Sequence, residues 1–287
     1  MTNKVQYFEK NVSGRDYVTG DIHGCLEDLL LALKAIKFDE NVDRLFSVGD
    51  LIDRGPNSYE CAQLVDKPWF HATKGNHEDM MIASVLRNDG HMTKMWLSNG
   101  GQWIYQTGTW QQKYVNGELE ALATKLNELP LVIVVGKGAN RFNIVHAEFY
   151  RVGAAPLGFQ PTLLNISNSD IDNWTFTPKE EERMLWGRNL IRTTTFDPNP
   201  QLYLSPTFVG HTPLSRMLRC FQHYYIDTAC VYHYVGTQKD TQALSFACPQ
   251  ERVVYSWSPA WKKLTSTPFA EIPMTESLIN TAPKTPN

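Results

Sequence analysis

The N-terminal half of the chain repeats one short pattern three times, in which an apolar segment leads to a glycine and then to a polar side chain. The apolar segments are 17–19, 44–48 and 69–73; the glycines are Gly20, Gly49 and Gly75; and the polar residues are Asp21, Asp50 and Asn76. Segments 26–36, 58–65 and 78–86, which lie between these strands or follow the last one, are predicted as helices. This alternation of strands and helices predicts a layered α/β fold.

The remainder of the chain is less regular. Residues 119–129 are predicted as a helix and Leu131–Val135 as a buried strand, whereas residues 150–185 are rich in Pro, Gly and Asn and are expected to form loops. Short β-like runs follow at 207–209, 224–226, 243–246 and 253–257. The sequence therefore predicts an α/β fold in which two sheets pack in the middle and helices lie outside.

Composition limits the class of protein and its partners. The chain has 287 residues, of which 42% are hydrophobic and 20% charged, as in globular proteins. Its net charge of −3 argues against a nucleic-acid partner, because phosphate backbones attract a positive surplus. The apolar run Leu131–Val135 is too short to cross a bilayer, so no membrane partner is expected.

The ends of the chain and its cysteines suggest where it resides. Residues 1–10 lack the apolar stretch of a signal peptide, and the five cysteines form no CxxC pair. A reduced, cytoplasmic protein is expected, and we expect a monomer. Residues 1–262 are predicted as one folded domain, and residues 263–287 as a flexible polar tail, because Pro, Thr, Ser and Asn dominate from Pro268 onward.

Metal-binding side chains recur where one apolar strand after another ends. Glycine before such a residue lets the chain turn sharply and point the next side chain outward. The resulting set mixes nitrogen and oxygen ligands and suits a pair of manganese, iron or zinc ions. Its members are Asp21, His23, Asp50, Asn76, His146 and His211. The other four histidines, His71, His91, His223 and His233, lie outside these strand-end segments.

Three long motifs carry a family resemblance. GDIHG at 20–24, GDLIDRG at 49–55 and GNHE at 75–78 resemble the signature of the phosphoprotein phosphatase family of metallophosphatases, in its phage lambda and bacterial branch. The resemblance covers roughly residues 5–250 and implies a calcineurin-like two-sheet β-sandwich flanked by helices. It also makes residues 1–262 the catalytic domain.

The resemblance implies a role for each matching residue. Asp21 and His23 hold the first metal, and Asp50 bridges both metals, which are expected to be two Mn²⁺ ions, with iron or zinc as alternatives. Asn76, His146 and His211 hold the second metal. Arg54 and Arg188 bind the phosphate through their guanidinium groups, which match phosphate oxygens.

The implied chemistry is direct attack on phosphorus by a hydroxide that bridges the two metals. His77 is the general acid that protonates the leaving alkoxide, and Asp53 keeps it oriented and protonated. The protein is thus expected to be a serine/threonine protein phosphatase that acts on phosphorylated proteins or peptides, with phosphotyrosine as a further substrate.

Two other functions remain open at this point. A symmetrical dinucleoside tetraphosphatase shares the GDxHGC motif, but tends to have Ala and Asp where this chain has Asp53 and Glu78, and Gly-His-Trp in place of 210–212. A scaffold that binds phosphorylated partners without catalysis would be expected to lose metal ligands, and none is missing.

The chain departs from the family pattern at Glu148 and Ala229, which puts the shape of the substrate pocket in doubt. Residues 150–185 match least and are expected to border the substrate groove.

Overall fold

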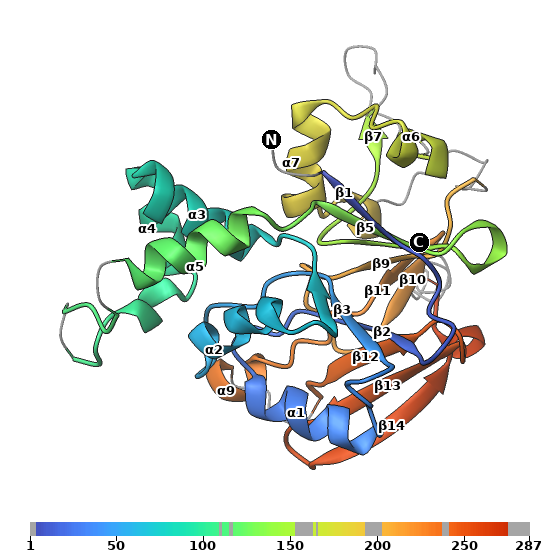
Figure 1. Ribbon diagram of the computed structural model, residues 1–287, viewed down its shortest axis with the longest axis horizontal. Helices are drawn as coiled ribbons and strands as arrows, with labels where there is room; N and C mark the ends of the chain where they lie inside the picture. Colours follow the sequence, from blue (N-terminus) through green and yellow to red (C-terminus); the bar gives the residue numbers. More distant parts are fainter. Residues whose placement is uncertain are drawn as a thin grey trace, which may run out of the picture.

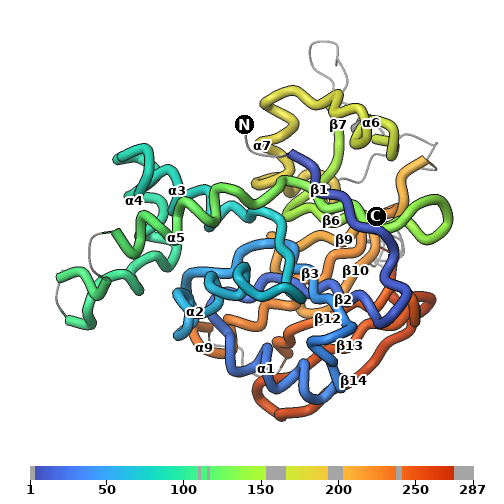
Figure 2. Tube along the Cα trace, in the orientation of Figure 1, coloured from blue at the N-terminus to red at the C-terminus, as the bar shows by residue number. Residues whose placement is uncertain are grey.

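The computed structural model describes residues 4–108, 111–114, 117–152, 163–164, 166–192, 203–236 and 241–274. Two six-stranded mixed sheets stack face to face, and helices lie on both outer sides (Figure 1). This arrangement confirms the predicted class, a two-sheet sandwich flanked by helices. Figure 2 shows how segments far apart in the sequence become neighbours, with β1 running beside β5 and the C-terminal strands beside β2.

The first sheet has the strand order β14-β13-β12-β2-β3-β4. Strands β2, β3 and β4 run parallel, so their carboxyl ends share one edge. Strands β12, β13 and β14 are antiparallel to their neighbours. The bounds are β2 (Asp16–Thr19), β3 (Arg44–Ser47), β4 (Phe70–Ala72), β12 (Leu244–Cys248), β13 (Val253–Ser258) and β14 (Lys263–Pro268).

The second sheet has the strand order β1-β5-β6-β9-β11-β10. Strands β6, β9 and β11 are parallel to one another, and their carboxyl ends therefore share one edge as well. The bounds are β1 (Val5–Phe8), β5 (Val132–Val135), β6 (Phe142–Val145), β9 (Thr207–Val209), β10 (Leu218–Cys220) and β11 (His223–Tyr225). A two-stranded ribbon of β7 (Arg151–Val152) and β8 (Leu163–Leu164) stands apart from both sheets.

The core between the sheets follows from the period of two along each strand. On β2, Val18 faces the other sheet while Tyr17 faces the helices, and on β3 Phe46 and Leu45 divide in the same way. The facing side chains of the second sheet are Ile133, Val135, Phe142, Ile144 and Phe208. Burial of this apolar layer holds the two sheets in a fixed relative position.

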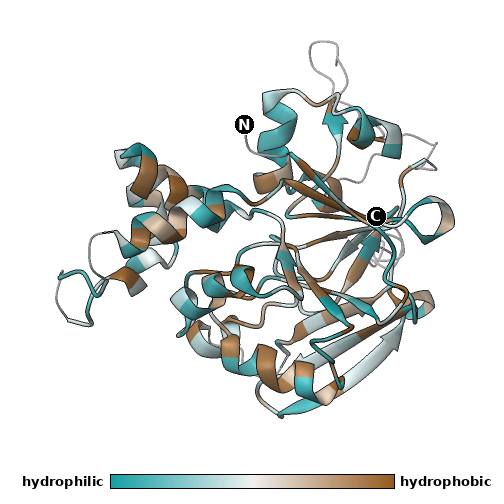
Figure 3. Ribbon diagram, viewed as in Figure 1, coloured by the Kyte–Doolittle hydropathy of each residue, from teal (hydrophilic) through white to brown (hydrophobic). Residues whose placement is uncertain are grey.

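Helices cover the outer face of the first sheet. Those that contribute to its hydrophobic cluster are α1 (Leu26–Ala35), α2 (Ser58–Ala62), α3 (Asn76–Arg87), α4 (Gly90–Ser98) and α5 (Glu118–Asn127). Helices α3, α4 and α5 pack together at one side of the sandwich (Figure 1). In Figure 3, α1 carries both hydrophobic and hydrophilic residues, as expected for a helix with one buried face. Short 3₁₀ turns at η1 (Gln63–Asp66) and η2 (Gly101–Ile104) and the helix α9 (Tyr232–Val235) complete this side.

Helices α6 (Asn168–Asp172), α7 (Pro178–Trp186) and α8 (Asn189–Arg192) pack on the second sheet. The prediction that residues 150–185 form loops is wrong for α6 and α7, whereas α8 lies beyond that range. The side chains of Ser167 and Thr177 cap the first turns of α6 and α7, and Asp170 and Glu180 return the hydrogen bonds. This Ser/Thr-x-x-Asp/Glu capping pattern is the signal in the sequence that indicates both helix starts. Within the predicted loop region, residues 153–162 and 165 lie outside the described residues.

The regular structure extends past the predicted start of the polar tail. Strand β14 pairs along its whole length with β13, and the 3₁₀ turn η4 (Phe269–Glu271) follows; the remaining turn, η3, covers Gly138–Asn140. Phe269 and Ile272 are buried in the core between the sheets. The side chains of β14 are largely exposed and mostly polar, which gives the strand the composition of a tail. Residues 275–287 lie outside the described part. Within the described residues, no helix has the length and hydrophobicity that a membrane span requires.

The burial of Phe269 predicts a large effect on stability. Its ring packs against Tyr224 and Phe208 with centroid distances of 5.2 and 6.0 Å. Phe269→Ala should lower the free energy of unfolding by about 3–5 kcal/mol, because it removes apolar contacts and leaves a cavity. Urea unfolding checks this, with exposed Trp261→Ala as the control. A similar small change in both variants would show that residues after β14 do not belong to the core.

Candidate metal centre

The six predicted ligand residues come together where both sheets present the carboxyl ends of parallel strands. Asp21 follows β2, Asp50 follows β3 and Asn76 begins α3 after β4, whereas His146 follows β6 and His211 follows β9 of the other sheet. All six predicted ligand residues, including His23, are at most 4% exposed. The core between the sheets therefore brings residues up to 190 positions apart into one buried cluster.

The first half of the cluster contains His23, Asp21 and Asp50. The Nε2 atom of His23 lies 3.5 Å from Asp50 Oδ2 and 3.9 Å from Asp21 Oδ2. The other ring nitrogen, Nδ1, donates to the carbonyl of Ile52 at 2.8 Å. This bond turns Nε2 toward the carboxylates and leaves it available to bind a cation.

The second half contains Asn76, His146 and His211. The Nε2 atom of His146 and the Nδ1 atom of His211 each lie 2.8 Å from the amide oxygen of Asn76. His146 Nε2 also lies 3.5 Å from Asp50 Oδ1, while its Nδ1 donates to the Val48 carbonyl at 3.0 Å. Asp50 thus presents one carboxylate oxygen to each half of the cluster.

The chemistry of these groups fits bound divalent cations. Burial, together with the charges of Asp227 and Asp50, raises the pKa of Asp21 well above its ordinary value, which shows how costly the buried carboxylates are without a compensating charge. Burial and neighbouring His146 lower the pKa of His211 to about 2, so its imidazole is neutral and can ligate. Among the described residues, its buried Nε2 has no hydrogen-bond partner.

The position of Arg54 also indicates that this cluster attracts positive charge. Its guanidinium places Nη1 2.6 Å from His23 Nε2 and Nη2 2.9 Å from His77 Nε2. The guanidinium is a permanent cation that only donates hydrogen bonds, so here it stands in for positive charge at the nitrogen that faces Asp21 and Asp50.

Asp50 is held in its position by Glu78, a role that the sequence analysis did not assign. Asp50 has a left-handed backbone with φ 51°, which costs energy in a residue with a side chain. The Glu78 carboxylate accepts hydrogen bonds from the backbone N–H groups of Asp50, Leu51 and Gly75 at 2.8–2.9 Å. Burial and the charge of Asp50 raise the pKa of Glu78 to about 7. The final Glu of the GNHE segment is the signal in the sequence for this contact.

Two glycines let the chain approach the carboxylates closely. A Cβ atom at Gly75 would lie 2.2 Å from Asp50 Oδ1, and one at Gly210 would lie 1.9 Å from Asp21 Oδ1. A side chain at either position would displace a carboxylate. These close approaches explain the glycines at 75 and 210.

His77 and Asp53 form a buried pair at the edge of the cluster. The Nδ1 atom of His77 lies 2.5 Å from Asp53 Oδ2, so the other ring nitrogen faces Arg54 and Asp50. Burial would lower the pKa of His77, but the charge of Asp50 and the hydrogen bond with Asp53 outweigh it and raise the pKa above its ordinary value. The geometry agrees with the pairing that the sequence predicts.

Two tryptophans complete the surroundings of Asp53. The indole N–H of Trp96 donates to both carboxylate oxygens at 3.0 Å, and that of Trp103 donates to Oδ1 at 2.7 Å. Asp53 therefore accepts from two indoles and one imidazole, which fixes its orientation. The sequence carries no local signal for these contacts, because Trp96 and Trp103 lie 43 and 50 residues away along the chain.

Arg188, the second predicted phosphate-binding residue, lies beside His211 and donates from Nη2 to its carbonyl at 2.9 Å. The segment after Arg188 is held by Glu148, whose buried carboxylate accepts from the N–H groups of Leu190 and Ile191 at 2.8 and 3.1 Å and from the Tyr225 hydroxyl at 2.8 Å. Glu148, which departs from the family pattern, is thus an anchor for the loop that carries Arg188.

Comparisons with known proteins agree with this geometry. A family model described as calcineurin-like phosphoesterase matches residues 16–231. The chain is 30% identical over 216 residues to serine/threonine-protein phosphatase 1 of Salmonella typhimurium, covering 75% of this chain and 87% of that protein. It is 37% identical over 133 residues to serine/threonine-protein phosphatase 2 of Escherichia coli, covering 46% of this chain and 58% of that relative's length.

Shorter and more distant similarities also occur. Over 72 residues the chain is 40% identical to a symmetrical bis(5'-nucleosyl)-tetraphosphatase of Actinobacillus pleuropneumoniae, covering 24% of this chain and 27% of that protein. The solved structure of a protein serine/threonine phosphatase from Saccharomyces cerevisiae superposes with a TM-score of 0.54 at 16% identity, covering 93% of this chain and 84% of that one. This last similarity shows a shared fold.

The ligand geometry predicts that divalent metal stabilises the protein. Adding Mn²⁺ to metal-stripped protein should raise the free energy of unfolding by about 2.7 kcal/mol when its concentration is a hundred times the dissociation constant. His146→Gln should weaken this response strongly, whereas exposed His91→Gln should respond as the unchanged protein does. Thermal unfolding with and without Mn²⁺ measures the shift. Equal shifts in both variants would contradict the assignment of His146.

Proposed function

Because this chain belongs to the calcineurin-like phosphoesterase family, we propose that it is a metal-dependent phosphomonoesterase that removes phosphate from phosphoserine and phosphothreonine in proteins. Two curated relatives with 30% and 37% identity are serine/threonine-protein phosphatases, which supports this substrate class. Phosphotyrosine is a further candidate substrate for the same site.

The observation that carries the proposal is the pair His77–Asp53 beside Arg54. Serine and threonine alkoxides are poor leaving groups, so their esters need a proton donor at the departing oxygen. His77 is held through Nδ1 by Asp53, and its Nε2 faces Arg54 and the cluster around Asp50. In the described arrangement Nε2 accepts from Arg54, and once Arg54 turns to a bound phosphate, Nε2 can carry the proton to the leaving oxygen while Asp53 stabilises the imidazolium.

The predicted ligand residues would provide the metal-dependent part of the reaction. Asp21, His23 and Asp50 would hold one divalent cation, and Asp50, Asn76, His146 and His211 a second. When bound, such cations supply Lewis-acid polarisation of the phosphate and lower the pKa of a water molecule to near neutrality. The mixed nitrogen and oxygen ligands accept Mn²⁺, iron or Zn²⁺, and we propose Mn²⁺.

Arg54 and Arg188 neutralise and orient the phosphate. The Arg54 guanidinium already lies between His23 and His77, where it can turn toward an incoming anion. Arg188 is fixed at the opposite half of the cluster by the His211 carbonyl, and Glu148 steadies the loop behind it. Phosphoryl transfer depends largely on such positioning and charge neutralisation.

A symmetrical dinucleoside tetraphosphatase is the second candidate, because a stretch of 72 residues is 40% identical to such an enzyme. A nucleoside diphosphate is a better leaving group than an alkoxide, so its release depends less on a general acid. The hydrogen bonds that Trp96, Trp103 and His77 make with Asp53 therefore favour the phosphomonoesterase.

Hydrolysis by metal-stripped protein, with and without Mn²⁺, tests the proposed function, measured as phosphate release from the peptides and as ADP formation from diadenosine tetraphosphate. A phosphothreonine peptide, a phosphotyrosine peptide and diadenosine tetraphosphate should be compared side by side. Mn²⁺-dependent turnover of the phosphothreonine peptide above that of the dinucleotide is expected. A preference for the dinucleotide would replace the proposal with the second candidate, and no turnover of any substrate would favour a binding protein without catalysis.

Removal of the general acid should affect substrates according to their leaving group. His77→Asn should lower kcat on a phosphothreonine peptide by about 10²–10⁴-fold. The loss on p-nitrophenyl phosphate should be much smaller, because nitrophenolate leaves without a proton. Steady-state kinetics on both substrates make the comparison. Equal losses would show that His77 acts in binding or metal retention instead.

Loss of one indole N–H should weaken the orientation of Asp53. Trp96→Phe should lower kcat on the phosphothreonine peptide by about tenfold and change p-nitrophenyl phosphate turnover less, since a hydrogen bond to a charged group contributes about 1.5–3 kcal/mol. Trp69→Phe is the matched control, because it shortens another buried tryptophan away from the site. If both variants lose peptide activity alike, the effect comes from packing rather than from Asp53.

A further inference from the structure

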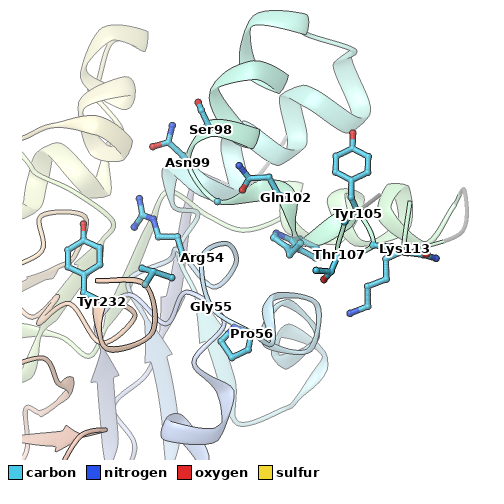
Figure 4. Close-up of a pocket in the computed structure, with 15 residues that line it drawn as sticks. Arg54, Gly55, Pro56, Ser98, Asn99, Gln102, Tyr105, Thr107, Lys113 and Tyr232 are labelled. Atoms are coloured by element: carbon cyan, nitrogen blue, oxygen red, sulfur yellow. The ribbon is translucent and has the colours of Figure 1, made fainter. Parts of the chain in front are cut away.

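A pocket of about 1220 Å³ opens beside Arg54 (Figure 4). Its walls come from the loop at Arg54–Pro56, the end of α4 with η2, the segment that reaches Lys113, and α9. Pockets that hold drug-sized ligands measure about 300–1,000 Å³, so this one exceeds what a phosphorylated side chain alone would fill. A larger part of the substrate can therefore lie here.

The pocket is connected to the reacting groups through two of its lining residues. Arg54 lies within 2.9 Å of His77 Nε2, and Trp103 donates its indole N–H to Asp53, the partner of His77. The backbone N–H of Arg54 also donates to the carbonyl of Gly100 at 3.3 Å, which joins the α4–η2 wall to the phosphate side. A substrate bound at Arg54 would extend directly into this pocket.

The lining has the polar groups that a polypeptide needs. Ser98, Asn99 and Gln102 present hydroxyl and carboxamide groups, which both donate and accept hydrogen bonds and so match peptide N–H and C=O groups. Trp103, Tyr105 and Tyr232 add aromatic surface for apolar side chains. In Figure 4, Gln102 and Tyr105 lie between Arg54 and Lys113, whereas Tyr232 lies on the other side of Arg54.

The charges of the pocket have one sign. Among the described residues that line it, Arg54 and Lys113 carry a positive charge and none is acidic. The Lys113 ammonium lies 5.3 Å from the centroid of the Tyr114 ring, which itself stacks on Tyr59 at 4.5 Å. These aromatic contacts hold the lysine side chain in place at the end of the pocket away from Arg54.

We propose that this pocket binds the polypeptide that flanks the phosphorylated residue, and that Lys113 selects substrates with an acidic side chain in that flank. The inference rests on the proposed function and adds a substrate preference to it. With the phosphate at Arg54, an acidic side chain several residues along the peptide reaches Lys113, while the hydroxyl and carboxamide groups pair with the peptide backbone between them.

A nucleotide substrate would use the pocket differently. Its phosphates follow one another directly and would cluster at Arg54, whereas here the second positive charge lies at the far end of the wall (Figure 4). Two positively charged side chains that are separated by hydrogen-bonding side chains favour a peptide over a nucleotide as the bound substrate. Diadenosine tetraphosphate is therefore included in the test as the competing ligand.

A set of phosphothreonine peptides tests this preference with Mn²⁺-loaded protein. Each peptide carries a single Glu, and the set places this Glu at successive positions before and after the phosphothreonine. In matched peptides Gln or Lys replaces the Glu. For one position, kcat/KM should be about threefold higher with Glu than with Gln, which is the effect of a partly exposed ion pair. Lys113→Glu should reverse the order so that Lys is preferred there.

Two controls separate the pocket from the catalytic centre and from net charge. Hydrolysis of p-nitrophenyl phosphate should be the same in Lys113→Glu and the unchanged protein, since this small ester does not reach Lys113. Lys263→Glu makes the same change of charge on the exposed strand β14 and should leave the peptide preference intact.

The remaining outcomes overturn the inference. A preference for Glu that persists in Lys113→Glu, or no preference at any position, would show that Lys113 does not select the substrate. A Lys113→Glu variant that loses diadenosine tetraphosphate turnover alone would assign the pocket to a nucleotide. If no phosphopeptide is hydrolysed while p-nitrophenyl phosphate is, the proposed function itself fails and this inference fails with it.

Discussion

The hydrogen bonds around Asp50 are the constraint on which the site depends. Its backbone N–H donates to Glu78, its carbonyl accepts from the N–H groups of Ile22 and His23, and its side-chain Oδ1 accepts from the N–H of His77. One residue in a left-handed conformation thus fixes the loop after β2, the loop after β3 and the start of α3. Its carboxylate can then face both halves of the cluster, which is what a residue shared by two cations requires.

The core between the sheets fixes where the second sheet places its histidines relative to Asp50. His146 and His211 come from the sheet opposite Asp50, so their distance from it depends on how the sheets stack. Val48 links the two sheets, because its side chain is buried between them while its carbonyl accepts a hydrogen bond from His146 Nδ1. The N–H of His211 donates to Asp21, which ties the loop after β9 to the loop after β2. Packing of apolar side chains therefore sets the ligand distances.

The sequence predicts what is local and misses what is distant. The segments around Asp21, Asp50 and Asn76 are recognisable because glycine, ligand and strand end lie within a few residues, and the structure brings these residues together. Trp96 and Trp103 reach Asp53 from another helix and turn, so no spacing indicates their contacts. The Pro and Asn content around α6 and α7 favours loops, whereas the capping residues Ser167 and Thr177 indicate the helix starts. The polar strand β14 has the composition of a tail, and its pairing with β13 cannot be inferred from that composition.

The segment from α4 to Lys113 combines two tasks that are usually separate. Trp96 and Trp103 hold Asp53, and the same stretch supplies Asn99, Gln102 and Lys113 to the pocket beside Arg54. A change at Trp103 would alter the pocket wall and the orientation of the His77–Asp53 pair together. Lys113 contacts Tyr114, whose ring packs against Trp103 with a centroid distance of 5.6 Å, so Lys113 lies further from Asp53 than Trp103 does. The proposed substrate preference can therefore vary at the far end of the pocket with less effect on the His77–Asp53 pair, while the wall next to Asp53 is constrained by both tasks.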